Sequence, residues 1–244
     1  MPCQLLIGSG CLPGREGLRQ LIAQTGEAGV LVMASSVVGS NSHRKPDVAE
    51  FRGFALVDDL APLIFVNAAD SKAAQMFTLA HELAHLWLGK SGISDTEVGR
   101  LSRQGTERWF NRVAAELLMP LAGLRREYRQ DSTVADEVQR LARVFKVSTL
   151  VTLRRLFDAG FVNRPTLWQS YEEEVARIRK LDRGDSGSGD FYHTLGARTG
   201  RRFARVLISN ALEGQTLFQD AFRMLGIRKT ATFYEAARKL GIMP

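Results

Sequence analysis

The sequence is poor in cysteine and has no long apolar run, and these absences exclude several classes of protein. Its only cysteines are Cys3 and Cys11, whose spacing matches no metal motif, so we expect reduced thiols rather than a disulfide framework. No apolar run approaches the ~20 residues that span a bilayer. The first ten residues lack the basic region of a secretory signal, so we expect a cytoplasmic protein without a membrane partner.

The composition is that of a globular protein with excess positive charge. The 244 residues are enough for one large domain or two small ones. The 45% apolar and 24% charged content is typical of a globular protein. The net charge of +7 favours an acidic partner such as nucleic acid, although the same charge also aids solubility.

Short β-prone runs precede the first long helical pattern. They are residues 30–33, 54–57 and 63–66, separated by turn-forming residues. Three strands in a row before a helix predict a small antiparallel sheet. The helical pattern at residues 77–88 follows Asp70 and Ser71, which are suitable N-cap residues, and Gly89 ends it.

Most of the remaining chain has helical spacing. We expect a short amphipathic helix at 17–24, a helix from about 106 to 118 that stops at Pro120, two helices within 134–160, and a charged helix at about 170–181. Residues 183–190 have the composition of a flexible linker. The remainder, 191–244, is predicted to be helical with breaks at Gly214, Gly226 and Gly241.

The segment His81-Glu82-Leu83-Ala84-His85 carries the strongest chemical signal in the chain. Histidines at i and i+4 share one helical face, so two imidazoles can bind one Zn²⁺. Glu82 is rotated by about 100° from His81 and cannot readily join them as a ligand, but it can accept a proton from a water molecule at the metal. This pattern predicts a zinc-dependent hydrolase; the alternative is a core helix with two hydrogen-bonded histidines.

A catalytic zinc needs a third protein ligand, and Glu107 and Glu116 compete for that role. They are nine residues apart, so they lie on opposite faces of one helix. Glu107 is followed at i+4 by Asn111, which suits a polar side chain that orients a ligand histidine. We assign Glu107 to the metal, with a solvated first-turn glutamate as the alternative, and Glu116 to an ion pair. Tyr128 is a weak candidate for an oxyanion donor, with ordinary packing as its alternative.

Two further segments have features of nucleic-acid binding. Within 134–160, a helix, a short turn and a second helix capped by Ser148 resemble a helix-turn-helix. Its candidate phosphate contacts are Arg143, Lys146, Arg154 and Arg155. The alternative, which we favour, is that this helical pair buttresses the preceding domain. The basic tail after residue 198 could bind DNA or a protein substrate, or only dock on the rest of the chain.

The segments around the predicted metal site resemble the ImmA/IrrE family of metallo-endopeptidases. The similarity covers about residues 28–160 and is carried by Glu50-Phe-Arg-Gly-Phe-Ala55, Ala61-Pro-Leu-Ile-Phe-Val-Asn67, Phe77 to His85, Glu107-Arg-Trp-Phe-Asn111 and Ala114-Ala-Glu-Leu-Leu-Met-Pro120. The family precedent also supports Glu107, rather than Glu116, as the metal ligand. The resemblance implies an α+β, zincin-like fold in which a small antiparallel sheet accompanies the active-site helices.

The resemblance also implies a function, namely zinc-dependent cleavage of a helix-turn-helix transcriptional repressor in a mobile-element or stress-response circuit. Many members carry their own N-terminal helix-turn-helix, whereas this chain has a Gly-rich leader there. We divide the chain into a leader (1–24), a zincin-like metallopeptidase domain (25–125), a helix-turn-helix-like helical extension (126–182), the linker (183–190) and a basic helical C-terminal domain (191–244). The alternative function is a non-proteolytic DNA-binding or toxin–antitoxin-type regulator that uses the fold as a binding scaffold.

Overall fold

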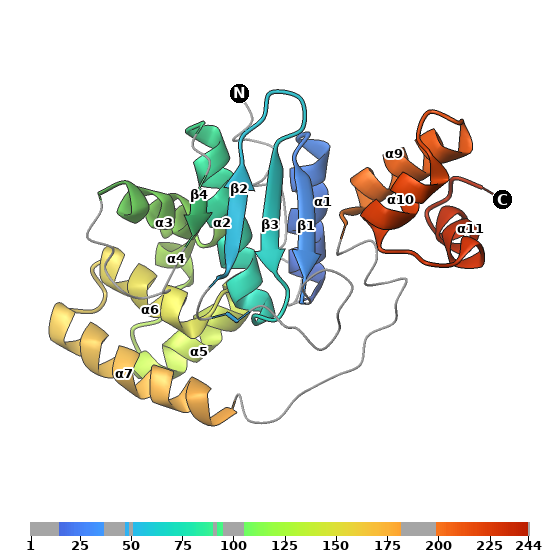
Figure 1. Ribbon diagram of the computed structural model, residues 1–244. Coiled ribbons are helices and arrows are strands. Elements are labelled where there is room, and N and C mark those ends of the chain that lie inside the picture. Colours follow the sequence, from blue (N-terminus) through green and yellow to red (C-terminus); the bar gives the residue numbers. More distant parts are fainter. Residues whose placement is uncertain are drawn as a thin grey trace.

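The computed structural model describes residues 15–36, 47–48, 51–89, 92–94, 105–181 and 199–243. The fold is α+β, as predicted, and these described residues form one sheet and a series of helices (Figure 1). None of the described helices is both long and apolar enough to cross a membrane. Cys3, Cys11 and the predicted linker at 183–190 lie outside the described residues.

The sheet has four strands in the order β1-β3-β2-β4 (Figure 1). The strands are β1 (Leu31–Ser35), β2 (Gly53–Leu56), β3 (Leu63–Asn67) and β4 (Gly92–Ser94). The three predicted strands are confirmed, but the prediction of an antiparallel sheet is wrong, because β1 pairs in parallel with β3. β2 is antiparallel to both β3 and β4. The long connection between β1 and β2 allows β2 to pair with the edge of β3 that β1 does not occupy. The sequence does not predict β4, because three residues are too few to show an alternating pattern.

Two helices cover one face of the sheet. Helix α1 (Arg15–Glu27) and helix α2 (Lys72–Trp87) lie behind the strands in Figure 1 and pack against them. Alternation along β3 buries Ile64 and Val66 against these helices. Leu18 and Leu21 of α1 belong to the same core, although the predicted domain boundary leaves them outside.

Helix α2 begins where the sequence predicts and is buried on nearly every side. The hydroxyl of Ser71 caps it by accepting a hydrogen bond from the backbone N–H of Ala74. Every residue from Gln75 to His85 is buried. The sheet covers one side of α2 and helix α3 (Gly105–Leu118) covers another, so side chains that leave α2 toward α3 enter an enclosed space.

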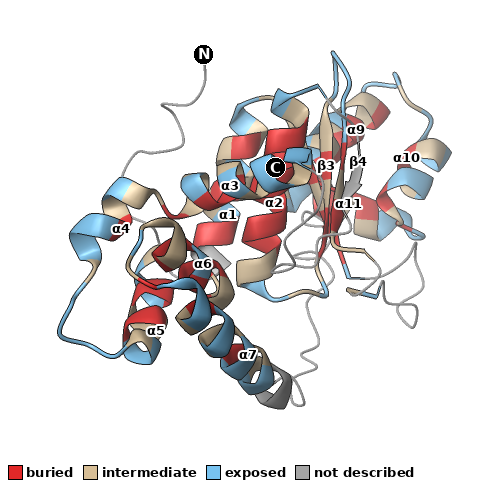
Figure 2. Ribbon diagram, turned by 90° about the vertical axis from the view of Figure 1, so that its left-hand side faces the viewer, coloured by how far each residue is buried: buried red, intermediate tan, exposed pale blue. Residues whose placement is uncertain are grey.

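The next four helices form a second core. They are α4 (Leu121–Glu127), α5 (Val134–Phe145), α6 (Thr149–Asp158) and α7 (Arg164–Leu181), the last beginning six residues before the predicted start. Ser148 caps α6, as predicted, by accepting from the N–H of Val151. Leu141, Leu153 and Leu156 are among the buried residues of this group. Figure 2 shows buried segments on α5 and α6.

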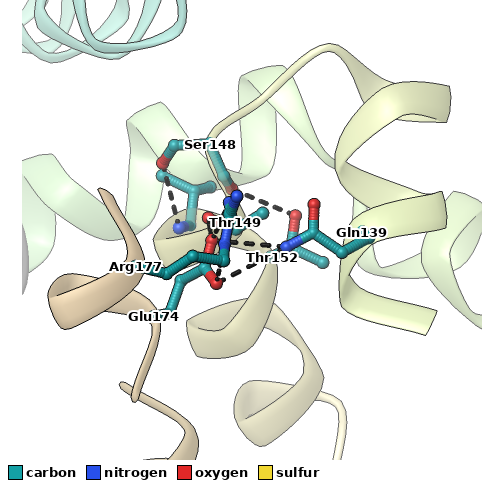
Figure 3. Close-up of polar contacts among 7 residues, drawn as sticks. Gln139, Ser148, Thr149, Thr152, Glu174 and Arg177 are labelled. Atoms are coloured by element: carbon teal, nitrogen blue, oxygen red, sulfur yellow. Dashed lines mark hydrogen bonds and ion pairs between the residues drawn. The ribbon is translucent and has the colours of Figure 1, made fainter. Parts of the chain in front are cut away.

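Glu174 of α7 is bonded to both of the preceding helices (Figure 3). Its carboxylate accepts hydrogen bonds from the hydroxyl of Thr149 on α6, from the amide of Gln139 on α5 at 3.4 Å, and from Arg177 one turn later at 2.6 and 2.8 Å. The Arg177 guanidinium, assisted by the Thr149 hydroxyl, holds the pKa of Glu174 below its ordinary value of 4.5. The carboxylate therefore ties α7 to α5 and α6.

The last three helices have a core of their own. They are α9 (Arg201–Leu212), α10 (Phe218–Leu225) and α11 (Thr230–Lys239), and the predicted breaks at Gly214, Gly226 and Gly241 are confirmed, each glycine having positive φ. Gly200 begins this unit at φ 76°, and a Cβ there would lie 2.6 Å from the carbonyl oxygen of Val32. Only glycine permits this close approach to β1. Arg202 donates to the carbonyl of Gly26 at 2.8 Å and adds a second contact with the N-terminal unit.

Candidate metal centre

The two histidines of the His-Glu-Leu-Ala-His segment leave α2 on the side that α3 covers. His81 is fully buried and His85 is 6% exposed. Their Nε2 atoms are 3.1 Å apart. Helical spacing of i and i+4 places the imidazoles on the same face, as the sequence predicts.

Glu107, in the first turn of α3, completes the cluster. One carboxylate oxygen lies 3.4 Å from Nε2 of His81, and the other lies 3.8 Å from Nε2 of His85. The adjacent imidazole of His81 holds the pKa of Glu107 below its ordinary value, so the group is a carboxylate at neutral pH. The side chain of Glu107 is 31% exposed, whereas those of the histidines are almost completely enclosed, so solvent reaches the cluster beside Glu107.

Neighbouring side chains on α3 set the orientation of both imidazoles. The Oδ1 atom of Asn111 is 3.0 Å from Nδ1 of His81. Because an amide oxygen only accepts hydrogen bonds, Nδ1 carries the proton and Nε2 directs its lone pair toward the cluster. The ring of Phe110 stacks on His85 with a centroid distance of 3.7 Å. The spacing of Glu107 and Asn111 predicts the first of these contacts, but nothing in the sequence distinguishes Phe110 from an ordinary core residue.

The geometry of the cluster fits a zinc ion. A tetrahedral zinc with bonds of about 2.0–2.1 Å separates its ligand atoms by roughly 3.3 Å. The three separations here are 3.1, 3.4 and 3.8 Å, and all the ligand atoms lie within 4.8 Å of one another. Two imidazole nitrogens and one carboxylate are also a donor set that zinc accepts while leaving one position open.

Glu82 lies beside this cluster on α2 but is not a member of it. The His, His and Glu group that can hold a metal excludes Glu82, in agreement with the expectation from its helical rotation. Glu82 is fully buried under β2, where Gly53 makes the space: a Cβ on Gly53 would lie 2.5 Å from Thr78 Cγ2, 2.8 Å from the carbonyl oxygen of Phe65 and 3.5 Å from Glu82 Oε1. The sequence does not predict this role of Gly53, because a glycine at the start of a strand carries no distinctive signal.

The other acidic candidate, Glu116, lies away from the cluster. It pairs with Arg155 of α6, as the prediction of an ion pair requires. Arg155 also donates to the carbonyl of Met119 at 2.9 Å and is only 3% exposed. The prediction that Arg155 contacts nucleic acid is therefore wrong, because a buried and paired guanidinium cannot reach a phosphate.

The remaining candidates on α5 and α6 lie outside the metal cluster. Arg143 is exposed, Lys146 is partly exposed in the left-handed conformation that ends α5, and Arg154 pairs with Asp158 at 3.2 Å. Six of the ten residues of α6 are buried. A helix so enclosed cannot enter a DNA groove, so the structure favours the buttressing alternative for this segment.

Tyr128 is not placed at the cluster. Its ring stacks on Phe161 with a centroid distance of 3.9 Å and packs against the core of the α4 to α7 group. Ordinary packing accounts for this residue.

Comparison with known families agrees with this geometry. The Peptidase_M78 model, described as the IrrE N-terminal-like domain, matches residues 25–157, which is more than half of the chain. A second model, described as a domain of unknown function (DUF8813), matches residues 199–239, the helices α9 to α11. No curated protein matches the chain. From the extent of the first match, which includes both histidines, Glu107 and Asn111, the chain belongs to the Peptidase_M78 family of IrrE N-terminal-like domains.

Proposed function

We propose that this protein is a zinc-dependent endopeptidase that cleaves a helix-turn-helix transcriptional repressor. Membership of a peptidase family supports a protein substrate. The observation that carries the proposal is the cluster itself, in which His81, His85 and Glu107 direct their donor atoms at one point. A carboxylate that only stabilised α3 would not require two enclosed imidazoles on the facing helix.

In this proposal His81, His85 and Glu107 hold the zinc ion. When bound, zinc would lower the pKa of a water molecule and polarise the scissile carbonyl. Asn111 fixes the tautomer of His81, and Phe110 limits rotation of the His85 ring. Both residues belong to α3, as Glu107 does, so packing of α3 on α2 assembles the ligands and their supports together.

Glu82 is the proposed general base. It follows His81 directly on α2, in a fully buried position. There its carboxylate accepts the proton of the attacking water and returns it to the leaving amine. Entry of the substrate takes place on the Glu107 side, because this is the side of the cluster open to solvent.

The identity of the substrate rests on family resemblance. Related peptidases act on repressors, and cleavage here would relieve repression in a mobile-element or stress-response circuit. Such a substrate would be met in the cytoplasm, which is the compartment we propose.

The test uses the purified 244-residue chain and, as the substrate, a helix-turn-helix repressor from a neighbouring gene where one is encoded. Metal analysis should find one zinc per chain, and incubation with the repressor should produce two fragments whose masses define a single cleavage site. Glu82→Gln should retain the metal and the fold but abolish cleavage. If Glu82→Gln leaves the derepression of the target genes unchanged in cells, the protein acts by binding and the peptidase proposal is wrong.

A further inference from the structure

The three C-terminal helices contain a second helix-turn-helix arrangement. Such a motif joins two helices by a turn of three or four residues that often contains glycine. Here α10 ends at Leu225, residues 226–229 form the turn, and α11 begins at Thr230. Gly226 adopts φ 67°, and the N–H of Ile227 returns to the carbonyl of Phe222 at 2.9 Å, which closes the end of α10.

Packing holds this pair of helices in a defined arrangement. Phe233 of α11 contacts Phe218 and Phe222 of α10, with ring centroids 5.4 and 5.2 Å away. Ile227, in the turn itself, is 4% exposed and joins the same core. The motif is therefore a fixed part of the bundle rather than a loop between two independent helices.

The exposure of the second helix distinguishes the α5–α6 motif from the α10–α11 motif. In a helix-turn-helix the second helix must enter the major groove, so one long face of it has to be exposed. α6 fails this requirement, as shown above. α11 buries only Phe233, Ala236 and Ala237, while its first two and its last two residues are exposed.

The exposed part of the C-terminal motif is basic. Arg228 and Lys229 are exposed in the turn immediately before α11, and Arg238 is exposed near its end. The side chain of Arg223, at the end of α10, is 78% exposed. Residues 199–243 contain eight Arg and Lys against three acidic residues, an excess of five, whereas the whole chain has a net charge of +7.

The contact with the N-terminal unit leaves this surface available. Gly200 and Arg202, which make that contact, stand at the start of α9 rather than on the motif. Figure 1 shows the three helices beyond β1, at the opposite edge of the sheet from β4 and α3. No side chain caps the first turn of α11, so its N–H groups point out beside Arg228 and Lys229, where they add to the attraction for a phosphate.

We propose that helices α10 and α11 form a DNA-binding helix-turn-helix, with duplex DNA as the ligand and Arg228 and Lys229 on its phosphates. The inference does not depend on peptidase activity. It gives the chain a site for DNA that is separate from the metal cluster, so the protein can hold DNA and cleave a protein at once.

The experiment measures binding of a fluorescently labelled 25-base-pair duplex to the full-length Glu82→Gln protein by anisotropy, between 50 and 200 mM NaCl. We expect affinity to fall steeply with salt, because phosphate contacts release counterions. The double variant Arg228→Ala/Lys229→Ala should bind on the order of 10-fold more weakly, and its salt slope should be smaller by about 2. Circular dichroism of the variant should be unchanged, since both side chains are exposed.

The matched control is Arg143→Ala/Lys146→Ala, which removes the same charge from the last turn of α5 and its C-cap. It should bind DNA as the parent protein does. Two outcomes overturn the proposal: absence of salt-dependent binding by the parent protein at ~10 µM, or equal weakening by both double variants, which would mean diffuse charge attraction. Neither outcome affects the peptidase proposal, because cleavage is measured separately.

Discussion

Replacement of Glu174 by alanine tests how the helices beyond the metal centre are held together. The substitution removes the acceptor shared by Thr149, Gln139 and Arg177, and it leaves the buried hydroxyl of Thr149 without that acceptor. A hydrogen bond to a charged group contributes about 1.5–3 kcal/mol, and the buried bond from Thr149 is lost in full. The bonds from Gln139 are long, at 3.4 Å, and their loss adds only about 0.5–1 kcal/mol. The bond from Arg177 adds little, because that side chain is 46% exposed and the pair is solvated. We expect Glu174→Ala to lower the free energy of unfolding by about 2–4 kcal/mol.

Urea denaturation at pH 7 measures this loss. Trp168, on the same helix, provides a fluorescence signal close to the change. The control is Arg177→Ala, which removes only the exposed partner and should cost less than about 1 kcal/mol. Equal losses in the two variants, or a loss below 0.5 kcal/mol for Glu174→Ala on the scale of ordinary surface substitutions, would refute the reasoning.

The same residue predicts a pH dependence with a defined sign. Its pKa in the folded protein lies below 4.5, so the folded state holds fewer protons on this group than the unfolded state does. The contribution of Glu174 is therefore present in full above about pH 5.5 and declines as the pH falls through 4.5 toward the folded pKa. Glu174→Gln should be less stable than the parent protein at pH 7, with the difference narrowing below pH 4.5.

Three further substitutions test the metal centre, the strand beside it and a buried arginine outside it. Asn111→Leu should weaken zinc binding about 10–100-fold in competition with a chelator, because His81 loses the partner that fixes its tautomer, and unchanged affinity would contradict this role. Gly53→Ala should lower the free energy of unfolding, measured with denaturant, by about 1–3 kcal/mol, because the added Cβ would collide with the backbone of β3 and a side chain of α2. The control is Gly26→Ala in α1, where a Cβ meets no atom within 4 Å, and it should be neutral or stabilising. Arg155→Ala should cost about 1–3 kcal/mol in the same assay, because it removes a buried side chain and leaves the carbonyl of Met119 without that donor. A similar cost for the exposed Arg154→Ala would show that burial is not the cause.

Local spacing carried most of the information about the candidate site. His81, Glu82 and His85 occupy one turn of a helix, and Glu107 and Asn111 occupy another, so helical geometry alone relates the members of each group. The caps at Ser71 and Ser148 and the breaks at Gly214, Gly226 and Gly241 are also local features, and the structure has all of them.

Local sequence patterns do not predict contacts between segments that are distant in the sequence. The parallel pairing of β1 with β3, the strand β4 and the space that Gly53 makes for Glu82 all depend on which elements meet. The stacking of Phe110 on His85 and the burial of Arg155 have the same origin.

Local sequence patterns were enough to predict which side chains share a helical face, the caps and breaks of several helices, and which residues could serve as zinc ligands. The packing of α3 on α2, the burial of α6 and the exposure of both ends of α11 follow from the tertiary structure. The tertiary structure also distinguishes the buried Arg155 from the exposed Arg143. The physical reason is the range of the interactions. Helical periodicity and capping act within a few residues, whereas burial and strand order depend on packing between segments far apart in the chain.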